Sequence, residues 1–131
     1  MKNGRQWKEF AVNPAASRSA VYASINRRGF VVLNRETWAM LGEARQVSLL
    51  YDEASLTIGV RPVSQLMPNS FPVVHDDRGR IFIRGLQFVH AARLDISYCI
   101  RFLDPHLEGN TLILDLNHTT RALGPRTSRD K

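Results

Sequence analysis

Short apolar and β-branched runs, separated by turn-forming residues, predict β-strands in the first half of the central chain. The runs cover residues 29–34, 45–51 and 56–60. The last two flank the turn-forming segment Asp52-Glu53-Ala54-Ser55, so together they predict a β-hairpin. Glu36 to Leu41 has the pattern of a short helix, which Asn34 can cap at its start and Gly42 can end.

The same order of elements recurs in the second half of the chain. A strand-like run at 79–84 is followed by a helical stretch at 86–94 and by another strand-like run at 97–103. Residues 104–110 contain proline and glycine and predict a turn, after which 111–116 predicts the closing strand of a second hairpin. Prolines at 62, 68 and 72 indicate a linker at 62–72 between the two halves.

The two halves match at ordered positions, which indicates an internal duplication. Arg28-Gly29 matches Arg78-Gly79, 31–33 matches 81–83, Asp52 matches Asp104, and 56–60 matches 112–116. Coincidence is the alternative, because short strand patterns are common. Neither strand–helix–hairpin unit can bury its apolar face alone, but two units can share one core. The sequence therefore predicts a mainly β fold with two short helices, in which tandem units at 22–63 and 73–116 form one barrel-like, pseudo-dimeric core.

Neither residues 1–20 nor residues 117–131 show sustained periodicity. We expect the first segment to be a flexible basic arm and the second a flexible basic tail, with a folded domain at 21–116 between them. An edge strand at Gln6 to Val12 is one exception that the pattern allows within the arm. No apolar run is long enough for a membrane span, and no apolar stretch follows the N-terminal basic residues as in a secretory signal. We therefore expect a cytoplasmic protein without membrane contact. Cys99 is the only cysteine, which excludes an internal disulfide.

The net charge of +6 comes from the two ends of the chain, because residues 21–120 hold ten arginines and ten acids. A basic balance favours polyanion partners, since each phosphate that is neutralised releases counterions. Arginine outnumbers lysine by 15 to 3, which suits bidentate contacts with phosphate or guanine. Arginine-rich codon usage explains the same excess. The eleven aromatic residues do not alternate with basic ones, which gives little support to stacking on single-stranded nucleic acid.

Each unit resembles the SpoVT/AbrB-like, swapped-hairpin family of small bacterial DNA-binding domains. The family pattern is a loop that ends in Gly-Arg, a strand, a helix that ends in Leu-Gly, and a hairpin. The second unit has Asp76-Asp77-Arg78-Gly79-Arg80 before its strand, and the first unit has Arg28-Gly29 and Leu41-Gly42. Two such units in one chain are similar to the arrangement in MraZ proteins. The sequence departs from the family at Phe30, which replaces the loop arginine, and at Trp38 and Ala39, which replace the helix arginines.

The resemblance implies sequence-specific binding of double-stranded DNA by a transcriptional regulator. It also implies that six loop arginines lie near one surface, where they would hold phosphates and read guanine edges in the major groove. These candidate residues are Arg27, Arg28, Arg35, Arg78, Arg80 and Arg84. A pseudo-two-fold pair of units favours an inverted-repeat site. The alternative is that the arginines are solvated or ion-paired, with Asp76 and Asp77 as the neutralising carboxylates.

Several other functions have less support in the sequence. It contains no HExxH, CxxC, phosphate-loop or nucleophile-elbow motif, so we expect no catalytic residue, no cofactor and no metal site. A protein-interaction module, such as an antitoxin-like or assembly subunit, is the alternative function, with the basic tail docking an acidic protein partner. The chain can be a monomer with an internal pseudo-dimer or a homodimer.

Overall fold

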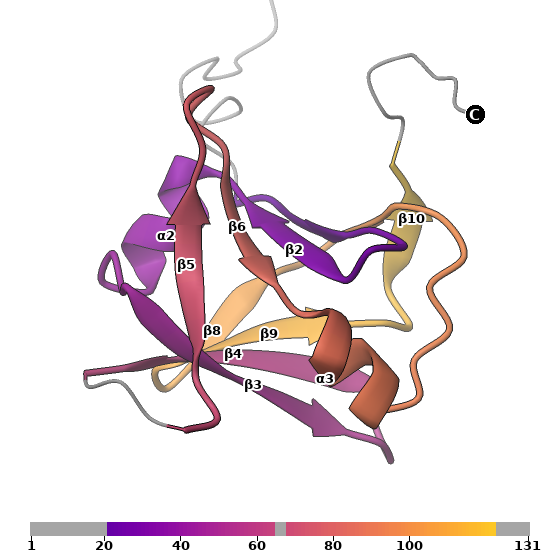
Figure 1. Cartoon of the computed structure of the whole chain (residues 1–131). Helices are drawn as coiled ribbons and strands as arrows, with labels where there is room; N and C mark the ends of the chain where they lie inside the picture. Colours follow the sequence, from indigo (N-terminus) through magenta and orange to yellow (C-terminus); the bar gives the residue numbers. More distant parts are fainter. Residues whose placement is uncertain (1–20, 65–67, 123–131) are drawn as a thin grey trace, which may run out of the picture.

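The computed structural model describes residues 21–64 and 68–122. They form a mainly β structure with two short helices, which confirms the predicted class (Figure 1). The strands are β1 (Ala23–Ile25), β2 (Phe30–Leu33), β3 (Gln46–Asp52), β4 (Thr57–Val63), β5 (Phe71–His75), β6 (Ile81–Arg84), β7 (Ile100–Phe102), β8 (His106–Glu108), β9 (Thr111–Asp115) and β10 (Thr119–Arg121). The helices are α2 (Arg35–Met40) and α3 (Leu86–Ala91).

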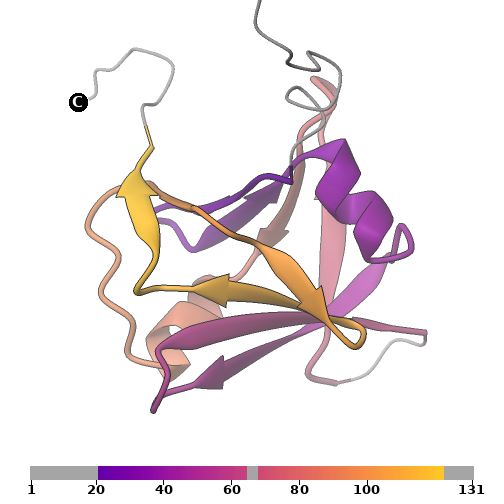
Figure 2. The same ribbon diagram turned by 180° about the vertical axis from the view of Figure 1, so that it is seen from behind.

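All the strands belong to one antiparallel sheet with the order β10-β7-β1-β2-β6-β5-β3-β4-β9-β8. The sheet folds over on itself, so we call β10, β7, β1, β2, β6 and β5 the first layer and β3, β4, β9 and β8 the second layer. The first layer lies above the second in Figure 1, and α2 and α3 lie on opposite sides of the molecule. Figure 2 shows the chain passing directly from β7 in the first layer to β8 in the second.

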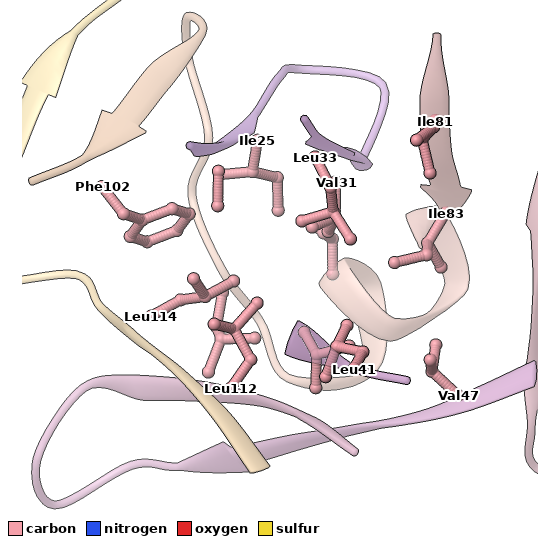
Figure 3. Close-up of a cluster of buried hydrophobic side chains, with 14 residues drawn as sticks. Ile25, Val31, Leu33, Leu41, Val47, Ile81, Ile83, Phe102, Leu112 and Leu114 are labelled. Carbon is pink, nitrogen blue, oxygen red and sulfur yellow. The ribbon is translucent and has the colours of Figure 1, made fainter. Parts of the chain in front are cut away.

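The core lies between the two layers, because alternate residues of each strand point inward. Ile25, Val31 and Ile83 from the first layer are fully buried, and they face Leu112 and Leu114 from the second (Figure 3). The rest of this cluster comes from both layers, from the residue that follows α2 and from α3: Ala23, Leu33, Leu41, Val47, Ile58, Val60, Ile81, Val89 and Phe102. The shared apolar interior agrees with the expectation that neither half can bury its apolar face alone.

The hairpins β1–β2 and β5–β6 have the same register at an offset of 50 residues. Ala23 pairs with Leu33 and Ile25 with Val31, whereas Val73 pairs with Ile83 and His75 with Ile81. The helices end in the same way at an offset of 51, since Gly42 (φ 68°) and Arg93 (φ 58°) are both left-handed. The register therefore agrees with the first of the sequence matches between the halves.

Asn34 caps α2 as predicted, because its Oδ1 accepts a hydrogen bond from the backbone N–H of Thr37 at 2.9 Å. The buried Thr37 hydroxyl also accepts from the backbone N–H of Tyr22 at 2.8 Å. The same hydroxyl donates a hydrogen bond to the carbonyl oxygen of Tyr22 at 2.9 Å. These contacts fix α2 against the chain that leads into β1.

The predicted hairpin between 97–103 and 111–116 is wrong. β7 pairs with β1 and β10, while β9 pairs with β4 and β8. Strand β8 lies inside the predicted turn at 104–110. Gly109 (φ 64°) and Asn110 are the two residues between the paired Glu108 and Thr111, so they form a tight turn that needs no longer loop. Pro105 between β7 and β8 has no backbone N–H, which favours an interruption of the strand there.

Three predicted boundaries also differ from the structure. The linker at 62–72 is shorter, because β4 runs to Val63 and β5 begins at Phe71. The helix predicted at 86–94 ends at Ala91, since the left-handed Arg93 stops it despite the apolar Leu94. The tail predicted at 117–131 contains β10, because Thr119–Arg121 finds a pairing partner in β7. The arm at 1–20 and the end of the tail lie outside the described residues.

The predicted barrel-like core is not confirmed by strand pairing. The order ends at β10 and β8, and no ladder joins these two strands in the part of the chain that the structure describes. β7 is the second strand in this order and β8 is the last, yet only residues 103–105 separate them in the chain. The sheet is therefore curled and open, and its closure into a barrel stays a prediction.

Candidate nucleic-acid interface

The six predicted arginines are exposed and belong to two groups at opposite ends of the β2–β6 ladder. Arg27 and Arg28 lie in the β1–β2 turn, and Arg84 lies beside this turn because it pairs with Phe30. The other three, Arg78, Arg80 and Arg35, lie in the β5–β6 turn, just before β6 and at the start of α2, respectively. The structure therefore places all six on the first layer or next to it, in two groups rather than in one cluster.

The two turns have the same geometry, because Asn26 and Asp76 have the same role in them. The Oδ1 of Asn26 accepts from the backbone N–H groups of Arg28 and Phe30, and the Oδ1 of Asp76 accepts from those of Arg78 and Arg80. Gly29 (φ 78°) and Gly79 (φ 82°) then take the left-handed conformation that each turn requires. Both turns thus present arginines from a rigid, hydrogen-bonded backbone.

Asp76 neutralises one of the candidate arginines. The Arg80 Nε donates to the Asp76 Oδ2 at 2.9 Å, and the guanidinium remains exposed. The hydrogen bond from the Arg80 side chain, followed by those from the backbone N–H groups of Arg80 and Arg78, lowers the pKa of Asp76 below its ordinary value of 3.8. The interpretation of Asp76 as a neutralising carboxylate is therefore confirmed for Arg80. Among the described residues, the other five arginines have no ion pair.

An aromatic cluster orients Arg80 and Arg84 on the outer face of the first layer. Their guanidinium carbons lie 5.8 Å and 5.7 Å from the centre of the Phe82 ring, which Phe30 stacks against at 5.1 Å. The sequence interpretation that aromatic and basic residues do not alternate is wrong here. The period-2 pattern of Arg80-Ile81-Phe82-Ile83-Arg84 is the signal that could have shown this arrangement.

Arg101 is a basic residue of the same face that sequence reasoning missed. It pairs with Ser24, which pairs with Val32, which in turn pairs with Phe82, so these side chains lie in one row on one face of the layer. Its guanidinium carbon is 5.2 Å from the centre of the Tyr22 ring. Because β1 and β7 are distant in the sequence, only the strand order places Arg101 on the same face as Arg80 and Arg84.

The two layers carry opposite charge. The strands of the first layer and the segments at 26–29 and 76–80 contain two carboxylates, Asp76 and Asp77, against seven arginines: Arg27, Arg28, Arg78, Arg80, Arg84, Arg101 and Arg121. Arg121 pairs with Ile100 and so lies on the side of the layer opposite to Arg101. The second layer and the residues within two positions of its strands contain two arginines, Arg45 and Arg61, against five carboxylates: Asp52, Glu53, Asp104, Glu108 and Asp115. The charged residues of the two layers thus give the first layer a basic balance and the second an acidic one.

Comparisons with protein-family models, curated proteins and solved structures give no match to this chain. The resemblance to the SpoVT/AbrB-like family therefore stays a prediction. The turn geometry, the exposure of the arginines and the division of charge are what bear on function.

The remaining ionisable groups of residues 21–64 and 68–122 include histidines and a cysteine outside the candidate surface. No group of three histidine, cysteine or acidic side chains there could hold a metal ion. His106 lies on the second layer, where the carbonyl oxygen of Asp104 at 2.8 Å and the carboxylate of Glu108 at 3.3 Å raise its pKa. Burial raises the pKa of the half-buried Cys99 thiol. Neither described helix is long and apolar enough to cross a membrane.

Proposed function

We propose that this protein binds double-stranded DNA through the outer face of its first layer, as a sequence-specific transcriptional regulator. The observation that carries the proposal is the division of charge, because six of the ten arginines of the neutral segment lie on the first layer or in its turns, whereas five of its ten carboxylates lie on or beside the second. A surface of one sign attracts a polyanion by long-range steering and by counterion release. A regulator of this kind acts where the chromosome is, so a cytoplasmic location is part of the proposal.

The register across β2 and β6 supports a pseudo-two-fold arrangement of the two units. Val31 pairs with Ile83, and Leu33 pairs with Ile81. At the offset of 50 residues between the units, Val31 corresponds to Ile81 and Leu33 to Ile83, so a two-fold rotation would turn one pair into the other. Val32 and Phe82, which pair with each other, then lie at the axis. We infer a pseudo-dimeric, barrel-like core of the SpoVT/AbrB-like type, in one chain that can act as a monomer or as a homodimer.

The spacing of the two turns suits a single DNA duplex. They lie beyond opposite ends of the β2–β6 ladder, and at about 3.3 Å per residue they are roughly 25 Å apart. B-DNA repeats its grooves about every 34 Å, so both turns can reach one side of the duplex within one helical turn. Arg80 and Arg84, at the two ends of the ladder, are already oriented by Phe82 between them, which lowers the entropy lost on binding.

The chemistry assigns different roles to the arginines. Arg27, Arg28 and Arg78 lie in exposed turns, where a flexible guanidinium can hold a phosphate. Arg84 is held on a strand, without an ion pair among the described residues, so it can present a planar fork to the O6 and N7 of a guanine. Arg35 lies at the start of α2, next to the second turn. No step of this function needs a catalytic residue, a cofactor or a metal.

The alternative function is a protein-interaction module without specific DNA binding. One observation favours it: the acidic outer face of the second layer has a hollow of about 540 Å³ around Gly59, which Asp52, Glu108 and Asp115 help to line. Such a face suits a basic partner, whereas the alternative predicted from the sequence uses the basic tail and an acidic partner. In both versions of this alternative, with a basic or an acidic protein partner, the protein would not bind DNA sequence-specifically.

Selection from a randomised duplex library, followed by affinity measurements, tests the proposed function. The full chain should bind its selected duplex at least about 1,000-fold more tightly than a shuffled duplex of the same composition at about 150 mM salt. Fluorescence anisotropy with competitor DNA measures this ratio. Equal affinity for the two duplexes would contradict sequence-specific binding and favour the alternative.

A further inference from the structure

We propose that the two halves of the DNA surface are unequal, and that Arg101 of β7 extends the half that contains β1 and β2. The preferred DNA site is then asymmetric, with one half bound more strongly and over a greater length than the other. This inference rests on the proposed DNA-binding function. It replaces the equal inverted repeat that the pseudo-two-fold pair of units favours.

Charge is the first difference between the two halves. In the half with β10, β7, β1, β2 and the turn at 26–29, three arginines lie on the outer face or in the turn, Arg27, Arg28 and Arg101, and the described residues contain no carboxylate. Arg121 of β10 pairs with Ile100 and lies on the other side of the layer. In the half with β6, β5 and the turn at 76–79, Asp76 and Asp77 accompany Arg78, Arg80 and Arg84. Phosphates approaching the second half meet carboxylates next to the arginines, and those approaching the first half do not.

The contacts increase this difference. Arg80 in the second half shares its charge with Asp76 at 2.9 Å. Arg84 belongs to β6 but pairs with Phe30, so it lies at the end of β6 that is next to Arg27 and Arg28. The β1–β2 end of the surface thus holds Arg84 together with the two turn arginines, while the β5–β6 end holds a partly neutralised set.

Arg101 has no basic counterpart in the other half. β7 is the neighbour of β1, and β3 has the corresponding place next to β5. The residues of β3 that pair with β5 are Gln46 and Val47, both uncharged. The segment leading into β3 adds one charge of each sign, Glu43 and Arg45. Strand β7 therefore lengthens the basic surface on one side only.

Position and orientation make Arg101 suitable for a phosphate contact. It is exposed, and it lies in the row that runs through Ser24 and Val32 to Phe82. The Tyr22 ring, 5.2 Å from its guanidinium carbon, holds it on the outer face. Ser24, which lies between Arg101 and Val32 in this row, is buried, whereas Arg101 is exposed.

The test compares Arg101→Gln with Arg61→Gln, which removes an exposed arginine from the second layer, and with Arg101→Lys, which keeps the charge. Hydroxyl-radical footprints and affinities are measured for the full chain on its selected duplex. For R101Q we expect about 10-fold weaker binding, a salt slope lower by about 1, and loss of protection at one end of the site only. R61Q should behave as the wild type, and R101K should recover the slope.

The outcomes separate this inference from the proposed function. Wild-type affinity and an unchanged footprint in R101Q, together with specific binding by the wild type, would overturn the inference alone. Equal protection on both sides of the site centre in the wild type would do the same. A wild-type chain that does not distinguish the selected from the shuffled duplex would overturn both. Thermal unfolding of R101Q at the wild-type midpoint shows that the substitution acts on binding and not on folding.

Discussion

Replacing Arg28 and Arg80 together with alanine should weaken binding to the selected duplex by about 100-fold or more, because contacts with phosphates or base edges are lost in both turns. The two residues lie in or next to the matching turns of the two units, so the double variant affects both halves of the surface. If each arginine contacts one phosphate, the slope of log affinity against log salt falls by about 2. Anisotropy titrations at several salt concentrations measure both quantities.

Two matched variants show whether the position of the charge decides the effect. Arg61→Ala with Arg93→Ala removes the same charge from exposed positions outside the first layer and its turns and should change affinity far less. Asp76→Asn should tighten binding, because it frees Arg80 while the amide oxygen can keep the turn, as Asn26 does in the first unit. Equal losses for the two double-alanine variants would mean that binding follows net charge and not the first layer.

Replacing Gly29 with alanine should destabilise the fold by about 3 kcal/mol or more, the largest effect expected of a single methyl group here. Gly29 has a left-handed φ of 78°, and a Cβ there would lie 2.6 Å from the Cα of Leu86. This Cα and the nitrogen of Leu86, which would lie 2.7 Å from the Cβ, both belong to the backbone, so the start of α3 has to move. That movement also weakens the hydrogen bond from the N–H of Gly85 to the carbonyl oxygen of Gly29 at 2.9 Å.

Gly79→Ala is the matched control, because it separates the cost of the backbone conformation from the cost of the contact. Gly79 has nearly the same φ, 82°, but a Cβ there would meet nothing within 4 Å. We expect a loss of about 1 kcal/mol for this variant from the left-handed conformation alone. Urea unfolding of both variants gives the difference. Equal losses would show that the first turn does not pack against α3 as described.

The local turn and helix chemistry could be predicted from the sequence, because it depends on residues close together in the chain. Asn34 caps the start of α2, and Gly42 follows its end. Gly29 and Gly79 take the positive φ that glycine allows. The β3–β4 hairpin was predictable for the same reason, since Asp52 to Ser55 supplies its turn. The class of fold follows from these elements.

Pairings between distant strands were not predictable in the same way. β8 and β10 contain only three residues each, with no periodic signal, and they are strands because β9 and β7 lie beside them. The strands β1 and β5 are similarly defined by β2 and β6. Proline at 72 indicated a linker, yet Pro72 pairs with Gln46 at the start of β5.

The candidate surface was only partly predictable for the same physical reason. The turn arginines were identified from Arg28-Gly29 and Arg78-Gly79, but the role of Arg101 depends on β7 lying next to β1. The sequence shows ten arginines and ten acids between 21 and 120, which gives a neutral sum. Only the folding of these residues into two layers reveals that the charges lie on different faces.

Mapping of backbone amide shifts by NMR, while the selected duplex is added to the isotope-labelled full chain, tests most directly which face meets DNA. Large shifts should occur in β1, β2, β6 and β7 and in the turns at 26–29 and 76–79, whereas the amides of β4, β8 and β9 should remain unchanged. Shifts concentrated in the acidic second layer, or absent from residues 21–122, would contradict the assignment of the first layer as the DNA-binding surface.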